Sequence, residues 1–336
     1  MGEPTLDDVA REVGVHASTV SRALNPERAR LVNPATRRAV EEAARKLGYR
    51  PDMIARGLQS GRTATVGVIV ADLGNTFVTP IIHQVAEALE TAAMMPVIAE
   101  TQDSHERFAR ILDHMISRRV DAIVTSAARA GDRQILVDAA RVLPVVVAAR
   151  PLPGSGLPQV IHDDEKGARL VVAHFAELGH TTVAQLRGPL DVGNFARRTR
   201  GFDISCRQLG LEQVPMEEVG SRPIYEEGRR LMNALLARAG PIPSAVFAQN
   251  DLMALGALAA LHGAGLGVPE DMSLAGYNDL PGMDLIAPPM TTVRYPSREI
   301  GRKAGELVIA LLAGGTPTDV CLEPVLVPRE STRSLH

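Results

Sequence analysis

A glycine at position 14 separates two short amphipathic segments near the start of the chain, and this spacing constrains the fold of its first 25 residues. Before Gly14, apolar residues recur at helical spacing, at Leu6, Val9, Ala10 and Val13. After it, Val20, Ala23 and Leu24 share one face of a second short helix. Ala10 is small where the helices would cross, and Gly14 tolerates the positive φ of a tight turn. The pattern therefore predicts a helix-turn-helix.

A third helix is predicted directly after this pair. Asn33 suits the N-cap, Pro34 suits the first helical position, and apolar residues then recur at helical spacing until Gly48 ends the helix. Residues 52–59 can form a further short helix, but so short a helix is not stable alone. The first 50 residues thus form a small all-α domain, and residues 51–62 form a linker.

Four sequence pieces resemble the LacI/GalR family of transcriptional repressors. They are TLDDVA from Thr5, TVSRALN (Thr19 to Asn25), the KLGYRP run (Lys46 to Pro51), and a hinge pattern that ends in Leu58. The resemblance continues through almost the whole chain. It implies a DNA-binding head on a core with the fold of periplasmic sugar-binding proteins.

The rest of the chain alternates apolar strands with helical stretches, which is typical of an α/β fold with parallel sheets. Strands such as residues 65–72, 120–127 and 143–150 are apolar on both faces, as expected of a buried parallel strand. The pattern restarts near residue 165, so we expect two doubly wound subdomains. The first takes residues 63–162 with about 293–322, and the second takes residues 163–292 with about 323–332.

Charge and composition limit the function classes. Residues 1–62 carry eleven basic and eight acidic side chains, and the remainder carries 25 basic and 31 acidic ones. A basic head on an acidic body suits a protein whose head meets phosphate. The chain has no apolar run of about 18 residues and starts without a signal-like segment, so we expect a cytoplasmic, nucleoid-associated protein without a membrane partner. Cys206 and Cys321 show no metal-site spacing, and neither a metal nor a cofactor is expected.

The second helix should enter the major groove of double-stranded operator DNA. The resemblance implies that Ala17, Ser18 and Arg22 contact base edges, and Arg22 can bind guanine through two hydrogen bonds. Thr5, Ser21 and Asn25 look like phosphate-positioning groups. The full set of predicted DNA-contacting residues in the head is Thr5, His16, Ala17, Ser18, Thr19, Ser21, Arg22 and Asn25. His16 departs from the serine that is usual there, so its role stays open between a cap and a phosphate contact.

Two further DNA contacts are predicted in the linker. The resemblance implies that Leu58 wedges into a minor-groove step and kinks the DNA. Ala55 would let two linker helices of a dimer approach closely, whereas Gly57 weakens such a helix. A palindromic operator needs two heads, so we expect a homodimer.

A small-molecule effector is expected in the cleft between the core subdomains, at the carboxyl ends of strands. The resemblance places Arg198 on the ligand, Asn250 begins a stretch that matches the family's NDxMAxG pattern, and Asn278 stands where many members have aspartate. The predicted effector-binding residues are Phe77, Ser126, Arg150, Asp163, Arg198, Asn250, Asp251 and Asn278. Asp251 has a helix cap as its alternative role. The effector is expected to be a sugar, a sugar acid or a sugar phosphate, the last two because arginines lie among these positions.

The sequence therefore favours a repressor of a carbohydrate-utilisation operon, controlled by this effector. An enzyme on the same core is disfavoured, because no GxGxxG follows a strand and neither GxxxxGK[ST] nor GxSxG occurs. A transport-type binding protein would not need Arg22 or Leu58. A corepressor-dependent regulator of another pathway remains an alternative, because the sequence does not show which state the ligand prefers.

Overall fold

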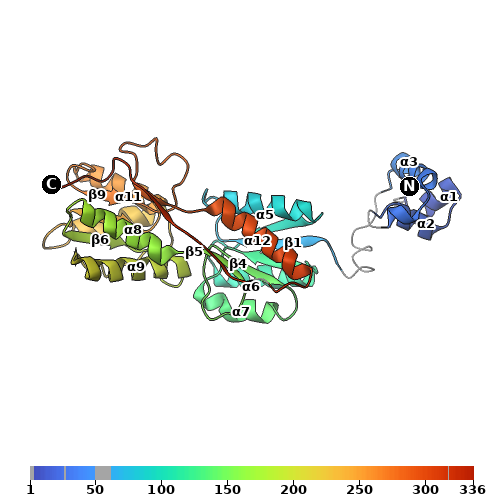
Figure 1. The fold of residues 1–336 in the computed structure, drawn as a ribbon, viewed down its shortest axis with the longest axis horizontal. Coiled ribbons are helices and arrows are strands. Elements are labelled where there is room, and N and C mark those ends of the chain that lie inside the picture. The colour runs from blue at the N-terminus through green and yellow to red at the C-terminus, as the bar shows by residue number, and fades with distance from the viewer. Residues whose placement is uncertain (1–3, 26–27, 50–61, 317) are drawn as a thin grey trace. The chain divides into compact units, whose positions relative to one another are not determined.

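A computed structural model describes residues 4–25, 28–49, 62–316 and 318–336. The chain divides into two compact units, Met1–Thr63 and Ala64–His336, each of which is described by itself (Figure 1). The predicted linker, with Ala55, Gly57 and Leu58, lies outside the described residues. None of the described helices is long and apolar enough to cross a membrane.

The first unit contains the predicted helices: α1 (Leu6–Val13), α2 (Ala17–Ala23) and α3 (Pro34–Leu47), with a short 3-10 turn η1 (Ala29–Leu31) before the last. Gly14 ends α1 with φ 70°, a left-handed conformation that favours glycine. Asn33 caps α3, because its Oδ1 accepts the Ala35 N–H at 2.9 Å. Val9, Val20 and Val40, one from each helix, are fully buried in the small core of the unit.

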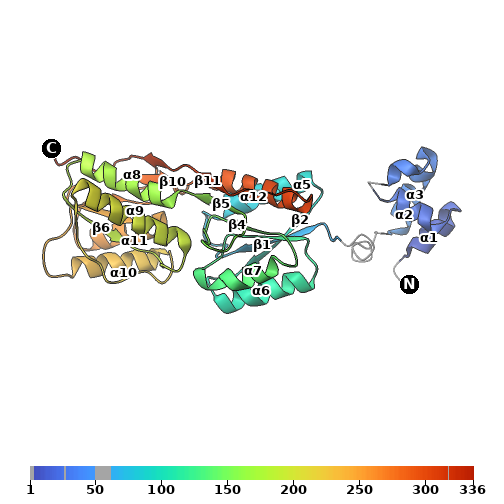
Figure 2. The ribbon, with the colours of Figure 1, turned by 60° about the horizontal axis from the view of Figure 1, so that its bottom comes forward.

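The second unit begins with a six-stranded parallel sheet in the order β11-β5-β4-β3-β1-β2. Its strands are β1 (Thr65–Val70), β2 (Met95–Glu100), β3 (Ala122–Thr125), β4 (Val145–Ala148), β5 (Gln159–His162) and β11 (Val320–Leu322). Helices α5 (Thr79–Thr91) and α12 (Ser297–Leu312) cover one face, and α6 (His105–Ser117) and α7 (Arg133–Ala139) cover the other (Figure 2). The strand order reverses beside β1, where α/β sheets bind ligands.

The second half of this unit is built on a four-stranded parallel sheet in the order β7-β6-β8-β9. Its strands are β6 (Thr182–Leu186), β7 (Glu212–Gln213), β8 (Ala245–Ala248) and β9 (Ser273–Ala275). Helices α8 (Asp164–Glu177) and α9 (Gly193–Leu209) lie on one face, and α10 (Tyr225–Leu236) and α11 (Asp251–Gly263) lie on the other. The two predicted parallel sheets are therefore present.

Three crossings join the two halves. The first leads from β5 into α8, the second from β9 back to α12, and the third from β11 into the C-terminal segment. Strands β10 (Thr292–Arg294) and β12 (Val325–Val327), from the last two crossings, pair as an antiparallel ribbon. The hydroxyl of Tyr295 donates to the carbonyl of Ala149 at 2.9 Å, so a crossing segment is also tied to the end of β4.

Candidate functional site

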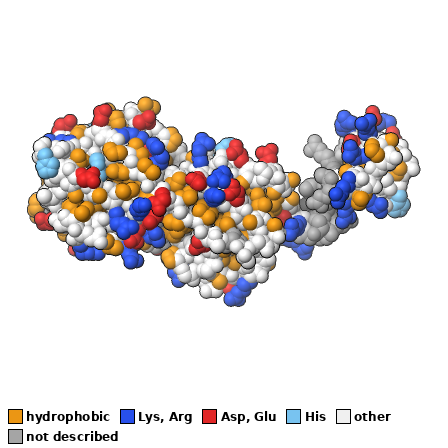
Figure 3. All heavy atoms as spheres, viewed as in Figure 1, with side chains coloured by type: hydrophobic (Ala, Val, Ile, Leu, Met, Phe, Trp, Pro, Cys, Tyr) orange, Lys and Arg blue, Asp and Glu red, His pale blue; other side chains and the backbone are white. Residues whose placement is uncertain are grey.

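The exposed face of α2 carries three polar side chains. Ser18, Ser21 and Arg22 are exposed, whereas Val20 and Ala23 are buried against the other helices of the first unit. Ala17 and Thr19 are half-buried, as is Asn25 just after the helix. Of the three side chains that were predicted to read bases, Ser18 and Arg22 are thus exposed on the surface of α2, and Ala17 is half-buried. Figure 3 shows several Lys and Arg side chains on the visible face of this unit.

His16 caps α2 with its ring. Its Nδ1 atom accepts the Ser18 N–H at 3.2 Å and lies 2.9 Å from the Ser18 hydroxyl oxygen. An acceptor Nδ1 needs the ring proton on Nε2, so this cap is made by a neutral histidine. Of the two roles left open for His16, the helix cap is present in the free protein. The side chains of His16 and Ser18 are both exposed.

Thr5 caps α1 in a reciprocal arrangement. Its hydroxyl oxygen accepts the Asp8 N–H, and the Asp8 carboxylate accepts the Thr5 N–H at 2.9 Å and the Thr5 hydroxyl at 2.7 Å. The hydrogen bond from the Thr5 hydroxyl is the largest cause of a lowered pKa at Asp8. The predicted phosphate contact of Thr5 thus falls on a residue that fixes the start of the helix-turn-helix.

A cavity of about 300 Å³ lies in the second unit, at the carboxyl ends of strands from both sheets. Five of the predicted effector residues line it: Phe77, Ser126, Arg150, Asn250 and Asn278. The other polar lining side chains are Asp72, Asn75, Asp103, Asn194, Arg222, Tyr225 and Glu226. Asp103 lies three residues after the end of strand β2, a position that a strand-end pattern can indicate, whereas Arg222 stands in a loop that no periodic pattern marks.

Within the part of the chain that the structure describes, three buried polar atoms of the lining have no hydrogen-bond partner: Ser126 Oγ, Asn194 Oδ1 and Asn278 Oδ1. Buried polar atoms are normally paired, so these atoms mark where a ligand or water would bind. Asn278 also has φ 119°, a conformation that is costly for a residue with a side chain. Its backbone is held there because its N–H donates to Val293 O at 2.9 Å and its carbonyl accepts the Tyr295 N–H at 3.3 Å.

The arginines of the cavity are paired with carboxylates. Nη1 of Arg150 donates to Oδ1 of Asp103 at 2.6 Å, and Nη2 of Arg222 lies 3.5 Å from Oδ2 of Asp72. Burial opposes ionisation of Asp103, yet Arg150 and Arg129 outweigh it and hold the pKa of that carboxyl below its usual value. The positive charges of the two lining arginines are therefore largely neutralised by carboxylates of the same lining.

Arg198 does not line the cavity. Its side chain is 1% exposed, its Nε donates to Oδ1 of the fully buried Asp164 at 2.9 Å, and its guanidinium lies 3.7 Å from the centre of the Tyr277 ring. Nη1 also donates to the carbonyl of Gln249 at 2.5 Å. The free protein thus uses Arg198 as an interior ion pair rather than presenting it in the cavity.

Asp163 and Asp251 also lie away from the cavity lining. Asp163 caps α8 through the Lys166 N–H at 3.1 Å and pairs with Arg197 at 3.2 Å. Asp251 is fully buried at the first residue of α11, and its carboxylate accepts the Leu280 N–H at 2.8 Å and the Thr292 hydroxyl at 2.7 Å. The helix cap that was the alternative role of Asp251 is made by Asn250, whose Oδ1 accepts the Met253 N–H at 2.8 Å.

Comparisons with known proteins show which family the chain resembles. Residues 5–52 match the family described as "Bacterial regulatory proteins, lacI family", and residues 172–332 match the "Periplasmic binding protein-like domain". The HTH-type transcriptional repressor CytR of Escherichia coli K12 is 31% identical, over 98% of this chain and 97% of its own length. The solved structure "transcriptional regulator CelR-cellobiose complex" is 32% identical with a TM-score of 0.74, over 98% of this chain and 99% of its own.

A second solved structure, of the lac repressor dimer bound to operator and the anti-inducer ONPF, superimposes with a TM-score of 0.88 at 25% identity, over 99% of this chain and all of its own. The similarity thus spans the head and the core together. The family consists of regulators rather than enzymes. With its helix-turn-helix head and its ligand-binding type of core, this chain belongs to the LacI family of DNA-binding transcriptional repressors.

Proposed function

We propose that this chain, as a homodimer in the cytoplasm, represses a carbohydrate-utilisation operon by binding an inverted-repeat operator, and that a neutral carbohydrate in the cavity releases it. The observation that carries the proposal is the pairing of two features in one chain. One is a recognition helix with a free polar face, and the other is a cavity with unpaired buried polar atoms.

Ser18 and Arg22 are the proposed base-reading side chains. Both are exposed on α2, and residues of this helix contact base edges in helix-turn-helix proteins. Arg22 carries a forked donor that matches O6 and N7 of guanine, whereas the Ser18 hydroxyl can donate or accept. Ala17, Thr19, Ser21 and Asn25 are proposed to contact the thymine methyl group or the backbone. Ala55 and Leu58 keep their proposed place at the minor groove, on sequence grounds alone.

A second copy of the chain is proposed to cover strand β2. This strand is one edge of the first sheet, so none of the described strands pairs with its outer row of backbone groups. Its side chains Met95, Val97 and Ile98 are 62%, 40% and 44% exposed. An apolar, unpaired edge of this kind favours association, and a two-fold dimer would bring two heads to one operator.

The charges of the cavity favour a neutral effector over an anionic one. Arg150 and Arg222 both have carboxylate partners, and Glu226 adds a further negative charge to the lining. A sugar acid or sugar phosphate would therefore have to displace a carboxylate from an arginine. Hydroxyl groups, in contrast, can donate to the unpaired oxygens of Ser126, Asn194 and Asn278. Cellobiose in the related CelR complex supports a ligand of this class.

Selection of bound duplexes from a random library tests the operator proposal. Full-length protein at near-physiological salt should recover an inverted repeat, and sedimentation should show a dimer on it. Arg22→Ala should lose the preference at one base pair in each half-site, at a cost of about 1–3 kcal/mol. Arg11→Ala serves as the matched control, since Arg11 is an exposed arginine of the preceding helix, and should leave every preference in place.

Failure to recover any motif from wild-type protein would contradict DNA binding without a ligand. Repeating the selection with a metabolite pool then tests the corepressor alternative. A single, unrepeated half-site would contradict the dimer.

Calorimetry with cellobiose, ribose and gluconate tests the effector class. We expect at least one neutral sugar to bind and gluconate to bind more weakly. Asn194→Ala should weaken binding of the neutral sugar by about 1–3 kcal/mol, because the sugar loses a hydrogen-bond partner. Asn233→Ala, on the outer part of α10, is the matched amide control. Tight gluconate binding with none of the neutral sugars would reject the neutral-ligand proposal.

A further inference from the structure

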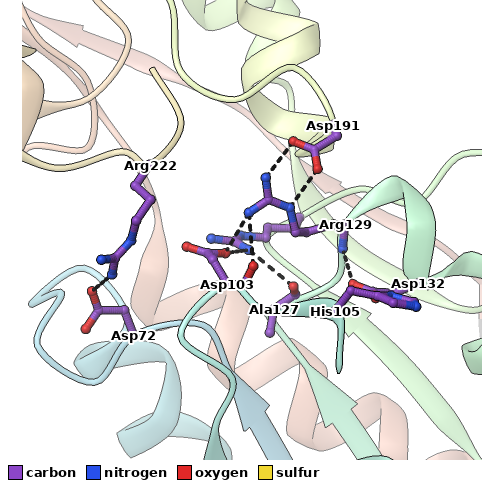
Figure 4. Close-up of polar contacts among 9 residues, drawn as sticks. Asp72, Asp103, His105, Ala127, Arg129, Asp132, Asp191 and Arg222 are labelled. Carbon is purple, nitrogen blue, oxygen red and sulfur yellow. Dashed lines mark hydrogen bonds and ion pairs between the residues drawn. The ribbon is translucent and has the colours of Figure 1, made fainter. Parts of the chain in front are cut away.

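A two-bonded ion pair joins the two halves of the core near the cavity. Arg129 follows strand β3 in the first half, and Asp191 lies between β6 and α9 in the second. Nε and Nη2 of Arg129 donate to Oδ2 and Oδ1 of Asp191, both at 2.7 Å (Figure 4). Such forked pairs are stronger and more directional than single contacts.

Backbone contacts hold the same loop against the first half. The Ala130 N–H donates to the carbonyl of Asp191 at 2.8 Å. A Cβ added at Gly193 would lie only 2.1 Å from the carbonyl oxygen of Pro151, so glycine alone permits this approach. Residues 191–193 of this loop therefore contact the first half through a side chain, a backbone carbonyl and a close backbone approach.

Arg129 is fixed from the first half before it reaches Asp191. Its Nη1 donates to the carbonyl of Asp103 at 3.3 Å, and its own N–H donates to Asp132 at 2.8 Å. Only 18% of its side chain is exposed. An ordered arginine loses less entropy on pairing than a free one, so this pair should be stronger than a pair between two fully exposed side chains. Consistently, the bond to Arg129 lowers the pKa of Asp191.

A second ion pair between the halves, formed by Arg222 and Asp72, is weaker. Arg222 and Asp72 make one contact at 3.5 Å, and their side chains are 44% and 30% exposed. Both residues line the cavity itself, whereas Arg129 and Asp191 do not. Figure 4 shows Arg222 and Asp72 apart from the group formed by Arg129, Asp103 and Asp191. The two ion pairs thus differ in how firmly they join the halves of the core.

We propose that Arg129 and Asp191 are positioning residues that hold the two halves at the spacing that forms the cavity, and that the Asp72–Arg222 edge opens to admit ligand. Asp103 connects the two regions, because it contacts Arg129 and also Arg150 of the lining. This inference rests on the proposed function, since it takes the cavity to be a ligand site.

Hydrogen exchange followed by mass spectrometry tests the inference on full-length, ligand-free protein. Asp191→Asn and Arg129→Ala should each raise exchange about tenfold in peptides that cover residues 126–132 and 188–194, because the Ala130 amide loses its protection. The double variant should add little to either single change, since the two side chains act as one unit. Arg302→Ala, which removes an exposed arginine paired only within α12, should change neither peptide.

Arg222→Ala tests the Asp72–Arg222 pair independently of the Arg129–Asp191 pair. It should raise exchange in residues 219–224 and leave residues 126–132 at the wild-type rate. Additive effects of Arg129→Ala and Asp191→Asn would overturn the tether, as would wild-type exchange in Asp191→Asn, a variant that changes an exposed carboxylate and should fold. Equal exchange at both edges in Arg222→Ala would overturn the open edge. Because no ligand is needed, these results stand whether or not any sugar binds.

Discussion

Replacing Arg198 with alanine is expected to destabilise the core by about 3–5 kcal/mol, because it leaves the buried carboxylate of Asp164 without its partner. Asp164 is 0% exposed, and the guanidinium of Arg198 also lies 3.7 Å from the centre of the Tyr277 ring. Urea unfolding of the core, followed by circular dichroism, measures the loss. The family resemblance alone would predict a different result, in which the effector response is lost and stability is kept.

Two further variants test whether the buried ion pair accounts for the loss of stability. Arg197→Ala removes the neighbouring arginine, whose side chain is 35% exposed and pairs with a half-buried aspartate, so it should cost less than about 1 kcal/mol. Arg198→Met combined with Asp164→Asn removes both buried charges and should recover much of the stability lost in Arg198→Ala. Wild-type stability of Arg198→Ala would show that the interior ion pair contributes nothing to the fold.

Asp251 should make the stability of the core depend on pH. Burial raises the pKa of this carboxyl to about 6, from an ordinary value of 3.8. The folded protein therefore binds this proton more tightly than the unfolded chain does, and the favourable contribution of protonation is greatest below pH 4. It declines as pH rises and is lost above pH 6, a change of about 3 kcal/mol for the single group.

Asp251→Asn isolates this contribution. An amide can keep the hydrogen bond from the Leu280 N–H and can donate to the Thr292 hydroxyl, but it does not titrate. Relative to Asp251→Asn, the wild-type free energy of unfolding should fall between pH 4 and pH 7. Parallel pH curves for the two proteins would contradict the raised pKa. Asp284→Asn, at a carboxylate on the surface, is the matched control.

Local signals explain why the head could be predicted closely from the sequence. A cap such as Asn33 or a terminating glycine such as Gly14 acts within one turn of its helix, so the residues themselves specify the boundary. The strands of the core were also expected, but several end two or three residues earlier than their apolar runs. Asp72 and Ser126, for example, belong to the loops that line the cavity.

Pairings between distant segments are harder to predict from the sequence. The bounds expected for the first subdomain include helix α12 and strand β11, but no local pattern specified that β11 pairs with β5 across about 160 residues. Ser126, Arg150 and Asn278 were expected in the cavity because they lie at strand ends, and all three line it. The buried position of Arg198 was not expected, because its partner Asp164 stands 34 positions earlier and no spacing rule connects the two.

The three crossings between the halves also bear on the order in which the chain can complete its fold during synthesis. Strands β1 to β5 leave the ribosome first, yet α12 and β11, which finish the same half, emerge only with residues 297–322. All four strands of the other sheet lie between them, within residues 182–275. Domains tend to fold as units when they become complete. All four strands of the second sheet are therefore translated before the first sheet is complete, and the α5 face of the first half stays uncovered until α12 has been translated.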